Sequence, residues 1–304
     1  MKGIDLFAGA GGTTTGAKKT GVNIVWAANH NPMAVAYHKK NHPEITHLCQ
    51  DLQQADWSLV PEHDIVFASP CCQGHSRAAG KKKETRKADL SRSTAWAVVS
   101  CLEAHRSPIS IIENVPDFLD WELYKPWESA METLGYSLSI NLVNACDLGI
   151  PQNRPRLFIV ATRSANPIRL NLKTELPVPA RTIVDLNEDG YKWDLVKNRV
   201  AATRLRVENG RKKFGDIFLD AAYGSARSGR SIDKPLGTVT TVNKHSLVIG
   251  DKIRPLSIRE LAAAQTFESD YIWPDSTVTT KIMIGNAVPP TMAQKITAAV
   301  LEAI

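Results

Sequence analysis

Short apolar runs alternate along the sequence with longer segments of helical periodicity, and each run ends in glycine, proline or polar residues. The apolar runs are residues 4–8, 23–28, 64–68, 109–112 and 157–161, and the helical segments are residues 33–40, 94–103, 127–134 and 291–301. Continuous apolar runs of this length are typical of parallel strands that are buried on both faces. The alternation therefore predicts an α/β fold built on a doubly wound, mostly parallel sheet.

The composition fits one large domain or two unequal ones. The chain has 304 residues, 43% of them hydrophobic, which is ample for a core. Five cysteines, two of them adjacent, do not form the pattern of a disulfide framework, which favours a reducing cytoplasm. No charged and apolar leader precedes Ile4, and no apolar run approaches the ~20 residues of a membrane span. We expect a soluble cytoplasmic protein.

Two adjacent cysteines, Cys71 and Cys72, follow the apolar run 64–68 directly. The carboxyl end of a strand in an open α/β sheet is where ligands bind. A thiol is also the side chain most easily activated as a nucleophile near neutral pH. The alternative is that these cysteines are small hydrophobic residues of a core. The pair alone does not decide between the two.

A glycine-rich segment, residues 9–16, follows the first apolar run. Glycines between a strand and a helix allow the backbone to approach a ligand near a helix N-terminus. The dinucleotide fingerprint would require glycine where Thr14 stands, which weakens a nicotinamide reading and leaves a nucleotide-like cofactor or a plain turn. Asn29 occupies the place of a ribose-binding acid, and Asp51 could accept from an adenine amino group or only make a turn.

Charged residues follow two later runs. Glu113 ends the run 109–112, where an acid near a cysteine of another strand suits acid–base and nucleophilic chemistry. A capping or ion-paired glutamate is the alternative. Arg154 and Arg156 stand two residues apart and, in extended backbone, would point to the same side and grip an anion or a carbonyl. Paired arginines on a surface strand are the alternative.

The formal net charge is +6, and the sequence pI is about 9.0. Basic residues gather at Lys81–Lys83 with Arg86 and Lys87, within residues 199–213, and at Arg227 and Arg230. A polyanionic partner is one explanation and a solvated face is the other.

Several of these segments, taken in order, resemble the DNA (cytosine-5)-methyltransferase family. They are DLFAGAGG at 5–12, PCCQ at 70–73, ENV at 113–115, QNRPR at 152–156, REL to QTF at 259–267, and GNAVPP at 285–290. Each is weak alone, but their shared order over nearly the whole chain is specific. The variable stretch between about residues 181 and 253 falls where the family has its target-recognition region.

The resemblance implies S-adenosyl-L-methionine as the methyl donor. The residues it implies around the cofactor are Phe7, Ala8, Gly9, Ala10, Gly12, Asn29, His30, Asp51, Leu52, Cys71, Asn286 and Val288. Two of them depart from the family pattern. Asn29 stands where the family has an acid, and Cys71 stands where it has a proline. No metal is implied.

The resemblance also implies the catalytic and DNA-binding residues. Alignment on Gln73 makes Cys72 the nucleophile that adds to cytosine C6, with Glu113 at N3 and Arg156, backed by Arg154, on the base carbonyl and backbone. The base would be flipped out of the duplex to reach them. The residues expected to contact DNA are Ser76, Lys81, Lys82, Lys83, Arg227 and Arg230.

From this resemblance we expect a Rossmann-like cofactor-binding and catalytic domain, residues 1–180 with 281–304, and a smaller target-recognition domain, residues 181–280. Double-stranded DNA is the expected partner. The protein would be a monomer of bacterial or phage type, in the nucleoid or encoded by a phage, with a cognate restriction enzyme as a further partner. A family relative that acts on RNA, and a catalytically inactive DNA-binding relative, remain alternatives.

Overall fold

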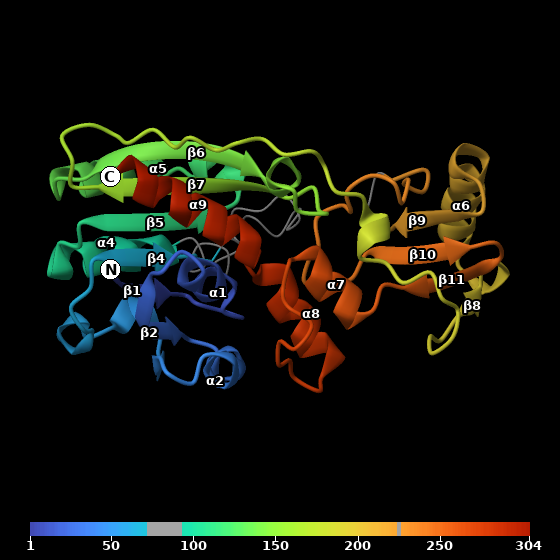
Figure 1. Ribbon diagram of the computed structural model, residues 1–304, viewed down its shortest axis with the longest axis horizontal. Helices are drawn as coiled ribbons and strands as arrows, with labels where there is room; N and C mark the ends of the chain where they lie inside the picture. Colours follow the sequence, from blue (N-terminus) through green and yellow to red (C-terminus); the bar gives the residue numbers. More distant parts are fainter. Residues whose placement is uncertain (72–92, 224–225) are drawn as a thin grey trace. The chain divides into compact units, whose positions relative to one another are not determined.

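The computed structural model describes residues 1–71, 93–223 and 226–304. The chain forms two compact units (Figure 1). Unit 1 comprises Met1–Asn144, Pro155–Lys173 and Ala287–Ile304, and unit 2 comprises Ala145–Arg154 and Thr174–Asn286. Within the described residues, no helix is both long and apolar enough to cross a lipid bilayer.

Unit 1 is built on a seven-stranded sheet in which only β7 runs against its neighbours. In spatial order the strands are β3 (Thr46–Cys49), β2 (Asn23–Asn29), β1 (Lys2–Leu6), β4 (Ile65–Ala68), β5 (Ile109–Asn114), β7 (Pro155–Thr162) and β6 (Ser137–Asn144). The predicted doubly wound, mostly parallel sheet is confirmed. The first strand ends at Leu6 rather than at residue 8, because Phe7 leaves the extended conformation with φ 61°.

Helices cover both faces of this sheet, and the alternation of side chains along β4 decides which helices meet which face. The α-helices in the described part of unit 1 are α1 (Gly12–Lys18), α2 (Pro32–Asn41), α4 (Trp96–His105), α5 (Tyr124–Thr133) and α9 (Pro290–Ala303). Val66 and Ala68 point into a core that they share with α4 and α5. Phe67, between them, points to the opposite face and lies beside Ile296 of α9. Helix α1 packs against α9 (Figure 1).

The strand order places the functional edge of unit 1. The chain passes from β1 outward through β2 to β3, and then returns to the other side of β1 as β4. The winding direction therefore reverses between β1 and β4. In open α/β sheets, ligands bind outside the carboxyl ends of the strands at such a reversal. The segments that follow β1, β2, β4 and β5 meet at this edge.

Unit 2 contains an antiparallel sheet of four strands in the order β8 (Asp194–Leu195), β11 (Lys252–Pro255), β10 (His245–Ile249) and β9 (Ile217–Ala221). Its helices are α6 (Ala201–Phe214), α7 (Ile258–Ala264) and α8 (Thr277–Asn286). Helix α6 packs on the sheet through a small core of Val207, Phe218, Val248 and Ile253.

Helix α7 begins at a capping box. Ser257 accepts a hydrogen bond from the backbone N–H of Glu260, whose carboxylate accepts from the backbone N–H of Ser257. The same carboxylate accepts two hydrogen bonds from the buried guanidinium of Arg254, at 2.7 and 2.8 Å. The cap therefore also ties α7 to β11.

Candidate active site

The loop after β1 holds the first group of predicted cofactor residues. Phe7, Gly9 and Gly11 all have positive φ, at 61°, 54° and 86°. The backbone N–H of Ala8 donates to the carbonyl of Ala28 in β2, at 3.0 Å, which fixes the loop over the adjacent strand end. Phe7, Ala8, Gly9 and Ala10 lie in this loop, and Gly12 is the first residue of α1. The loop thus brings bare backbone to the sheet edge.

A buried network of hydrogen-bonded side chains supports that loop, and sequence reasoning missed it. The Thr14 hydroxyl lies 2.7 Å from Oδ2 of Asp5 and 3.2 Å from Nε2 of His38. Burial raises the pKa of Asp5 to about 7 and lowers that of His38 well below its ordinary value. Helix α1 is therefore fixed to both β1 and α2. The separations of nine and 24 residues gave no local signal.

The next predicted group lies at the ends of β2 and β3. The Oδ1 atom of Asn29 accepts from the backbone N–H of Asn31 at 2.9 Å, and the Asn29 carbonyl accepts from Gln50 at 3.1 Å. His30 and Asp51 are exposed, whereas Leu52 is buried. The structure thus brings all four predicted residues, Asn29, His30, Asp51 and Leu52, to the strand ends beside the loop after β1.

Glu113 and Arg156 form an ion pair at the same edge. Glu113 lies near the end of β5 and Arg156 near the start of the adjacent antiparallel strand β7. The Arg156 Nε atom lies 2.9 Å from Glu113 Oε1, and the two side chains are 11% and 12% exposed. Arg156 Nη1 also donates to the carbonyl of Pro155 at 2.7 Å. The pair is held in one orientation while an edge of it stays open to solvent.

Asn114 and Thr94 position the segment that leads to the predicted nucleophile. The Asn114 amide donates to the carbonyl of Pro70 at 3.3 Å, and the backbone N–H of Cys71 donates to the Thr94 hydroxyl at 3.0 Å. Cys71 is half-buried at the end of the described segment. Sequence reasoning did not single out Asn114, although its place next to Glu113 was a signal. The predicted nucleophile Cys72 and the predicted DNA contacts Ser76, Lys81, Lys82 and Lys83 lie outside the described residues.

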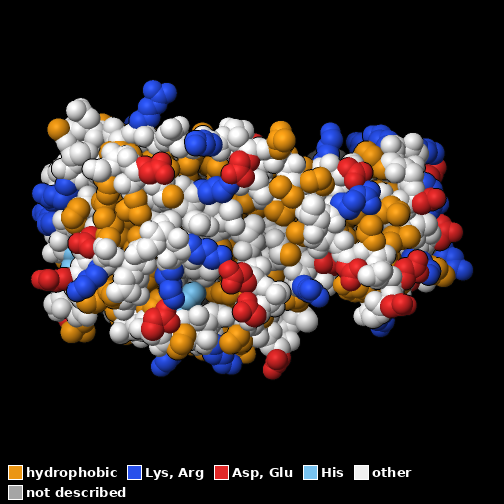
Figure 2. All heavy atoms as spheres, in the orientation of Figure 1, with side chains coloured by type: hydrophobic (Ala, Val, Ile, Leu, Met, Phe, Trp, Pro, Cys, Tyr) orange, Lys and Arg blue, Asp and Glu red, His pale blue; other side chains and the backbone are white. Residues whose placement is uncertain are grey.

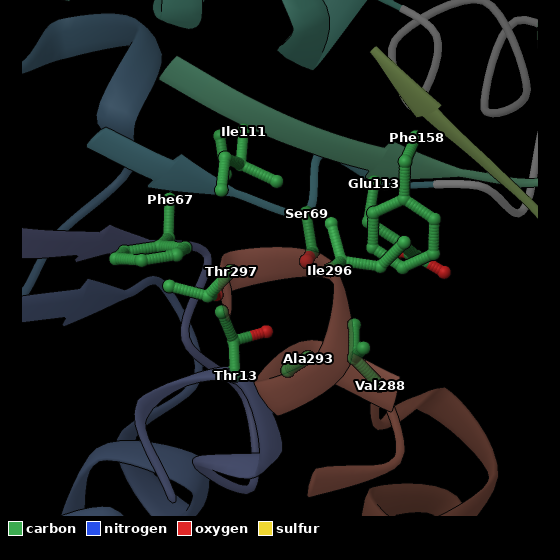
Figure 3. A pocket seen from close by; sticks show the side chains of 11 residues that line it. Thr13, Phe67, Ser69, Ile111, Glu113, Phe158, Val288, Ala293, Ile296 and Thr297 are labelled. Carbon is green, nitrogen blue, oxygen red and sulfur yellow. The ribbon is translucent and has the colours of Figure 1, made fainter. Parts of the chain in front are cut away.

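A small, mostly apolar cavity opens beside Glu113 in unit 1 (Figure 3). Phe67, Ser69 and Phe158 line its sheet side, and Val288 with Ile296 and Thr297 line its α9 side. Among the predicted site residues that the structure describes, only Glu113 and Val288 line it. Figure 3 shows Thr13 at the start of α1 facing the same space.

Of the predicted catalytic and cofactor residues, Arg154 and Asn286 belong to unit 2. Arg154 precedes β7 and is wholly buried, and its Nη1 and Nη2 atoms donate to the carbonyls of Val239 and Gly285, each at 2.8 Å. Arg156 hydrogen bonds within unit 1, so these two arginines have different surroundings. Asn286 is the exposed last residue of α8.

Several of the basic residues described in unit 2 form ion pairs. Arg206 pairs with Asp220, Arg211 with Asp251, and Lys212 with Glu208. The predicted DNA contacts Arg227 and Arg230 are both exposed, and the Arg230 guanidinium lies over the Tyr223 ring at 5.5 Å. Basic and acidic side chains lie interspersed on the face drawn in Figure 2.

Comparison with known proteins assigns the family. The profile of the C-5 cytosine-specific DNA methylase family matches residues 1–302. The chain therefore belongs to this family. It is a DNA (cytosine-5-)-methyltransferase, and S-adenosyl-L-methionine is its methyl donor.

Individual relatives agree with this assignment. The Type II methyltransferase M1.HphI of Haemophilus parahaemolyticus is 27% identical, over 98% of this chain and 86% of its own length. The Type II methyltransferase M.MthTI of Methanothermobacter thermautotrophicus is 28% identical, over 96% of this chain and 94% of its own length. Among solved structures, the Entamoeba histolytica methyltransferase EhMeth has the same fold, with a TM-score of 0.70 at 16% identity over 99% of this chain and 98% of that one.

The residues at the edge fit this cofactor. The loop after β1 offers close backbone approach, Leu52 offers an apolar surface, and the exposed Asp51 offers a carboxylate, of which one oxygen already accepts from the backbone of Gln53 at 3.1 Å. A nucleoside with an amino-acid tail requires acceptors for its hydroxyl and amino groups, and an apolar contact for its base. Asn29 presents a neutral amide at this edge, and an amide is a weaker acceptor for hydroxyl groups than a carboxylate.

Proposed function

We propose that the chain methylates C5 of a flipped cytosine in double-stranded DNA, through a covalent bond between the Cys72 sulfur and C6 of the base. The observation that carries the proposal is the Glu113–Arg156 ion pair, which lies at the sheet edge where the segment after β4 leads into Cys71 and Cys72. An oriented acid and a thiol at one strand edge are the two groups that this reaction requires.

The thiol has the first task in this mechanism. C5 of cytosine is a weak nucleophile, and addition of the Cys72 thiolate to C6 changes that. The S–C6 bond forms, the C5–C6 double bond opens, and its electron pair is delocalised toward N3. Glu113 donates a proton or a hydrogen bond at N3, which neutralises the charge that develops there. The base is then an enamine with a nucleophilic C5.

The remaining steps return the enzyme to its starting state. When bound, S-adenosyl-L-methionine supplies an electrophilic methyl group. C5 would take up that methyl group as the methyl–sulfur bond breaks, and the electron pair of that bond would leave with the thioether product. A base then removes the C5 proton, and the electron pair of that C–H bond restores the C5–C6 double bond as the thiolate leaves. As the ring is restored, N3 releases the proton that it received, and this proton returns to Glu113.

Arg156 orients the acid throughout this sequence. Its Nε atom holds Oε1 of Glu113, and its guanidinium is itself held through the Pro155 carbonyl. The other carboxylate oxygen is thereby aimed at N3, and the free edge of the guanidinium is available to the base carbonyl. In this proposal Arg156 is a binding group and Arg154 a supporting one.

The substrate has to leave the duplex, because neither C5 nor C6 of a stacked cytosine is accessible to a side chain. We propose that residues 1–180 with 281–304, which include all of unit 1, carry out the chemistry, and that residues 181–280, which lie within unit 2, recognise the sequence. We further propose that the protein acts as a monomer. The names of the relatives, Type II methyltransferases, support a cognate restriction enzyme as a partner.

Covalent trapping tests the mechanism. A DNA duplex with 5-fluorocytosine at the target should form a complex that survives denaturation and requires S-adenosyl-L-methionine, because fluorine at C5 cannot leave as a proton does. Mass spectrometry should map the bond to Cys72. The adjacent cysteine is the matched control: Cys71→Ser should still be trapped, whereas Cys72→Ser should not.

Three outcomes would contradict the proposal. A bond at Cys71 would show that the alignment on Gln73 is displaced by one residue. Trapping on RNA but not on DNA would identify an RNA methyltransferase. Absence of trapping, with no 5-methylcytosine in DNA from cells that express the chain, would identify an inactive relative.

A further inference from the structure

A short turn of unit 2, residues 240–243, is exposed at its tip but held firmly at its base. Val242 is 60% exposed, and Thr240 and Thr241 beside it are partly exposed. The Thr240 hydroxyl donates to the Val242 carbonyl at 2.7 Å, which closes the turn. Exposed loops are usually the more mobile parts of a protein. This one is fixed by groups from distant parts of the chain.

The central anchors are the buried residues Gln152 and Arg154. The backbone N–H of Val239 donates to Gln152 Oε1, and the Val239 carbonyl accepts from Arg154 Nη1, both at 2.8 Å. Gln152 also donates to the carbonyl of Ala264 and to the Gln265 side chain, at 3.0 and 2.8 Å. Both polar groups of Val239 are therefore held by side chains that are themselves enclosed.

Further hydrogen bonds fix both sides of the turn. The Tyr223 hydroxyl donates to the Thr238 carbonyl at 2.6 Å, and the Thr238 hydroxyl donates to the carbonyl of Asn153 at 2.8 Å. On the other side, the Asn243 amide donates to the carbonyl of Leu256 at 2.8 Å. The backbone that enters and leaves the turn is thus defined at each step.

The end of α8 supports the turn from beneath. Arg154 Nη2 donates to the Gly285 carbonyl at 2.8 Å, so one guanidinium holds the turn and the helix end together. A Cβ atom at Gly285 would lie 2.4 Å from the Thr240 carbonyl carbon and 2.4 Å from the Thr241 nitrogen. Only glycine allows the two backbones to approach this closely.

Burying a charged guanidinium is costly unless its hydrogen bonds are made. Arg154 is only 1% exposed, and its guanidinium donates hydrogen bonds to the backbone carbonyls of a turn and a helix end. A turn needed only to connect two strands would not require such support. A turn that reads base edges would, because recognition depends on side chains held within about 0.5 Å of their binding geometry.

We propose that the 240–243 turn reads base edges of the DNA recognition site, and that Arg154 is the positioning residue that holds it. Val242 would contact the C5 edge of a pyrimidine through its methyl groups, and the Thr241 hydroxyl would hydrogen bond to a neighbouring base edge. Arg230 lies over the ring of Tyr223, whose hydroxyl anchors Thr238, so a phosphate-binding cation stands next to the same anchor. This inference rests on the proposed function.

The test is the sequence preference of methylation. The full-length enzyme is incubated with S-adenosyl-L-methionine and a duplex library in which the positions around each cytosine vary, and 5-methylcytosine is mapped by bisulfite sequencing. The wild type should give one defined site. Val242→Ala should relax the preference at one base position by about 10-fold or more, a change of the size that a single base contact produces.

Two variants test the positioning role without changing a residue of the turn itself. Arg154→Lys keeps the charge but loses the two-pronged contact, and Gly285→Ala pushes on Thr240 and Thr241 from below. Both should relax the same base position as Val242→Ala and raise KM for duplex DNA about 10-fold or more. At saturating DNA, kcat of Gly285→Ala on the preferred site should stay within about 3-fold of the wild type, because the chemistry is performed by Glu113 and its neighbours.

Gly210→Ala is the matched control, since its Cβ atom would press on the Phe218 ring in the same unit, at 2.4 Å, within the small core under α6, which contains no residue of the turn. It should leave the preference unchanged. If Arg154→Lys and Gly285→Ala lose activity equally in every sequence context, in step with the folded fraction, Arg154 has only a structural role. If Val242→Ala keeps the wild-type preference, the turn does not read bases. If the wild type makes no 5-methylcytosine at all, it is the proposed function that fails.

Discussion

Arg154 and Arg156 are two residues apart in one motif, and comparing their surroundings separates two uses of a buried charge. Arg156 is 11% exposed and holds the carboxylate of Glu113 at the sheet edge of unit 1. Arg154 is 1% exposed, and its Nη1 and Nη2 atoms donate hydrogen bonds to two backbone carbonyls of unit 2. A group that must meet a substrate keeps part of its surface open. A group that holds backbone is enclosed on all sides.

The carboxylates of unit 1 show the same contrast. Glu113 and Asp5 lie on strands that flank β4, but Glu113 is partly open and paired with an arginine, whereas Asp5 is wholly buried beneath the loop after β1. Its Oδ2 atom is bonded to Thr14, and Oδ1 has no hydrogen-bond partner among the described residues. Such an environment favours the protonated carboxyl group, and a raised pKa here marks burial rather than catalysis.

The largest effect is expected when Glu113, the group that would meet the substrate, is changed. Glu113→Gln keeps the size of the side chain and a hydrogen bond to Arg156, but it cannot deliver a proton to N3. We expect the single-turnover methylation rate to fall by about 10²- to 10⁴-fold, the range typical of general acid catalysis. Rapid-quench assays with saturating DNA and S-adenosyl-L-methionine measure this rate, and circular dichroism shows whether the variant is folded.

Arg156→Lys serves as the partner variant. It keeps the charge beside Glu113 but loses the planar contact, so a smaller loss than for Glu113→Gln is expected. A rate within 10-fold of the wild type for Glu113→Gln would show that the ion pair is structural, and the contrast with Arg154 would then disappear.

Much of the sheet edge could be predicted from the sequence. Parallel strands bring their carboxyl ends to one edge, so residues that follow separate apolar runs, such as Asn29, Asp51, Cys71 and Glu113, were expected to meet there. The structure brings them to that edge. This inference requires only strand type and direction, and both can be recognised from local patterns of apolar residues.

The partners of buried polar groups could not be predicted in this way. Arg154 contacts carbonyls 85 and 131 residues further along the chain, and nothing in the local sequence indicates which backbone groups they are. The same is true of the side-chain hydrogen bonds that link Asp5, Thr14 and His38. The antiparallel insertion of β7 between β5 and β6 also depends on pairing over a long separation. Contacts of this kind are set by how whole elements pack, which local periodicity does not encode.

Asp5→Asn tests, through the pH dependence of stability, whether the buried Asp5 carboxyl group is protonated in the folded protein. The ordinary pKa of 3.8 rises to about 7 in the folded protein, so the folded state binds this proton more tightly than the unfolded state does. The resulting stability is present below about pH 4 and is lost as the pH rises to about 7. Asparagine cannot titrate, so the variant loses this dependence. The difference in unfolding free energy, wild type minus variant, should fall by up to about 1.4 kcal/mol per pH unit across that interval.

Denaturant unfolding of both proteins at pH 4.5–7.5 provides the measurement. Burial lowers the pKa values of His42 and His245 to about 4, so their contributions rise with pH over part of the same interval. They are common to both proteins and cancel in the difference. Parallel stability profiles for the two proteins would show that Asp5 is ionised in the fold, and its burial would then require another explanation.

The smallest effect is expected at Asn29, which lies at the sheet edge as Glu113 does but also holds backbone as Arg154 does. It is 9% exposed, and its Oδ1 atom accepts a hydrogen bond from the backbone N–H of Asn31. It is also the last residue of β2, next to the loop after β1. Asn29→Glu places a carboxylate where the sequence resemblance predicts an acid, and Asn29→Gln matches its length without the charge. A hydrogen bond from the ribose hydroxyls to a charged acceptor is stronger than one to an amide. Calorimetry should therefore show S-adenosyl-L-methionine binding about 5- to 10-fold more tightly to Asn29→Glu than to Asn29→Gln. Equal affinities would mean that the side chain at this position only holds backbone, as Arg154 does, and that the ribose is bound by other groups.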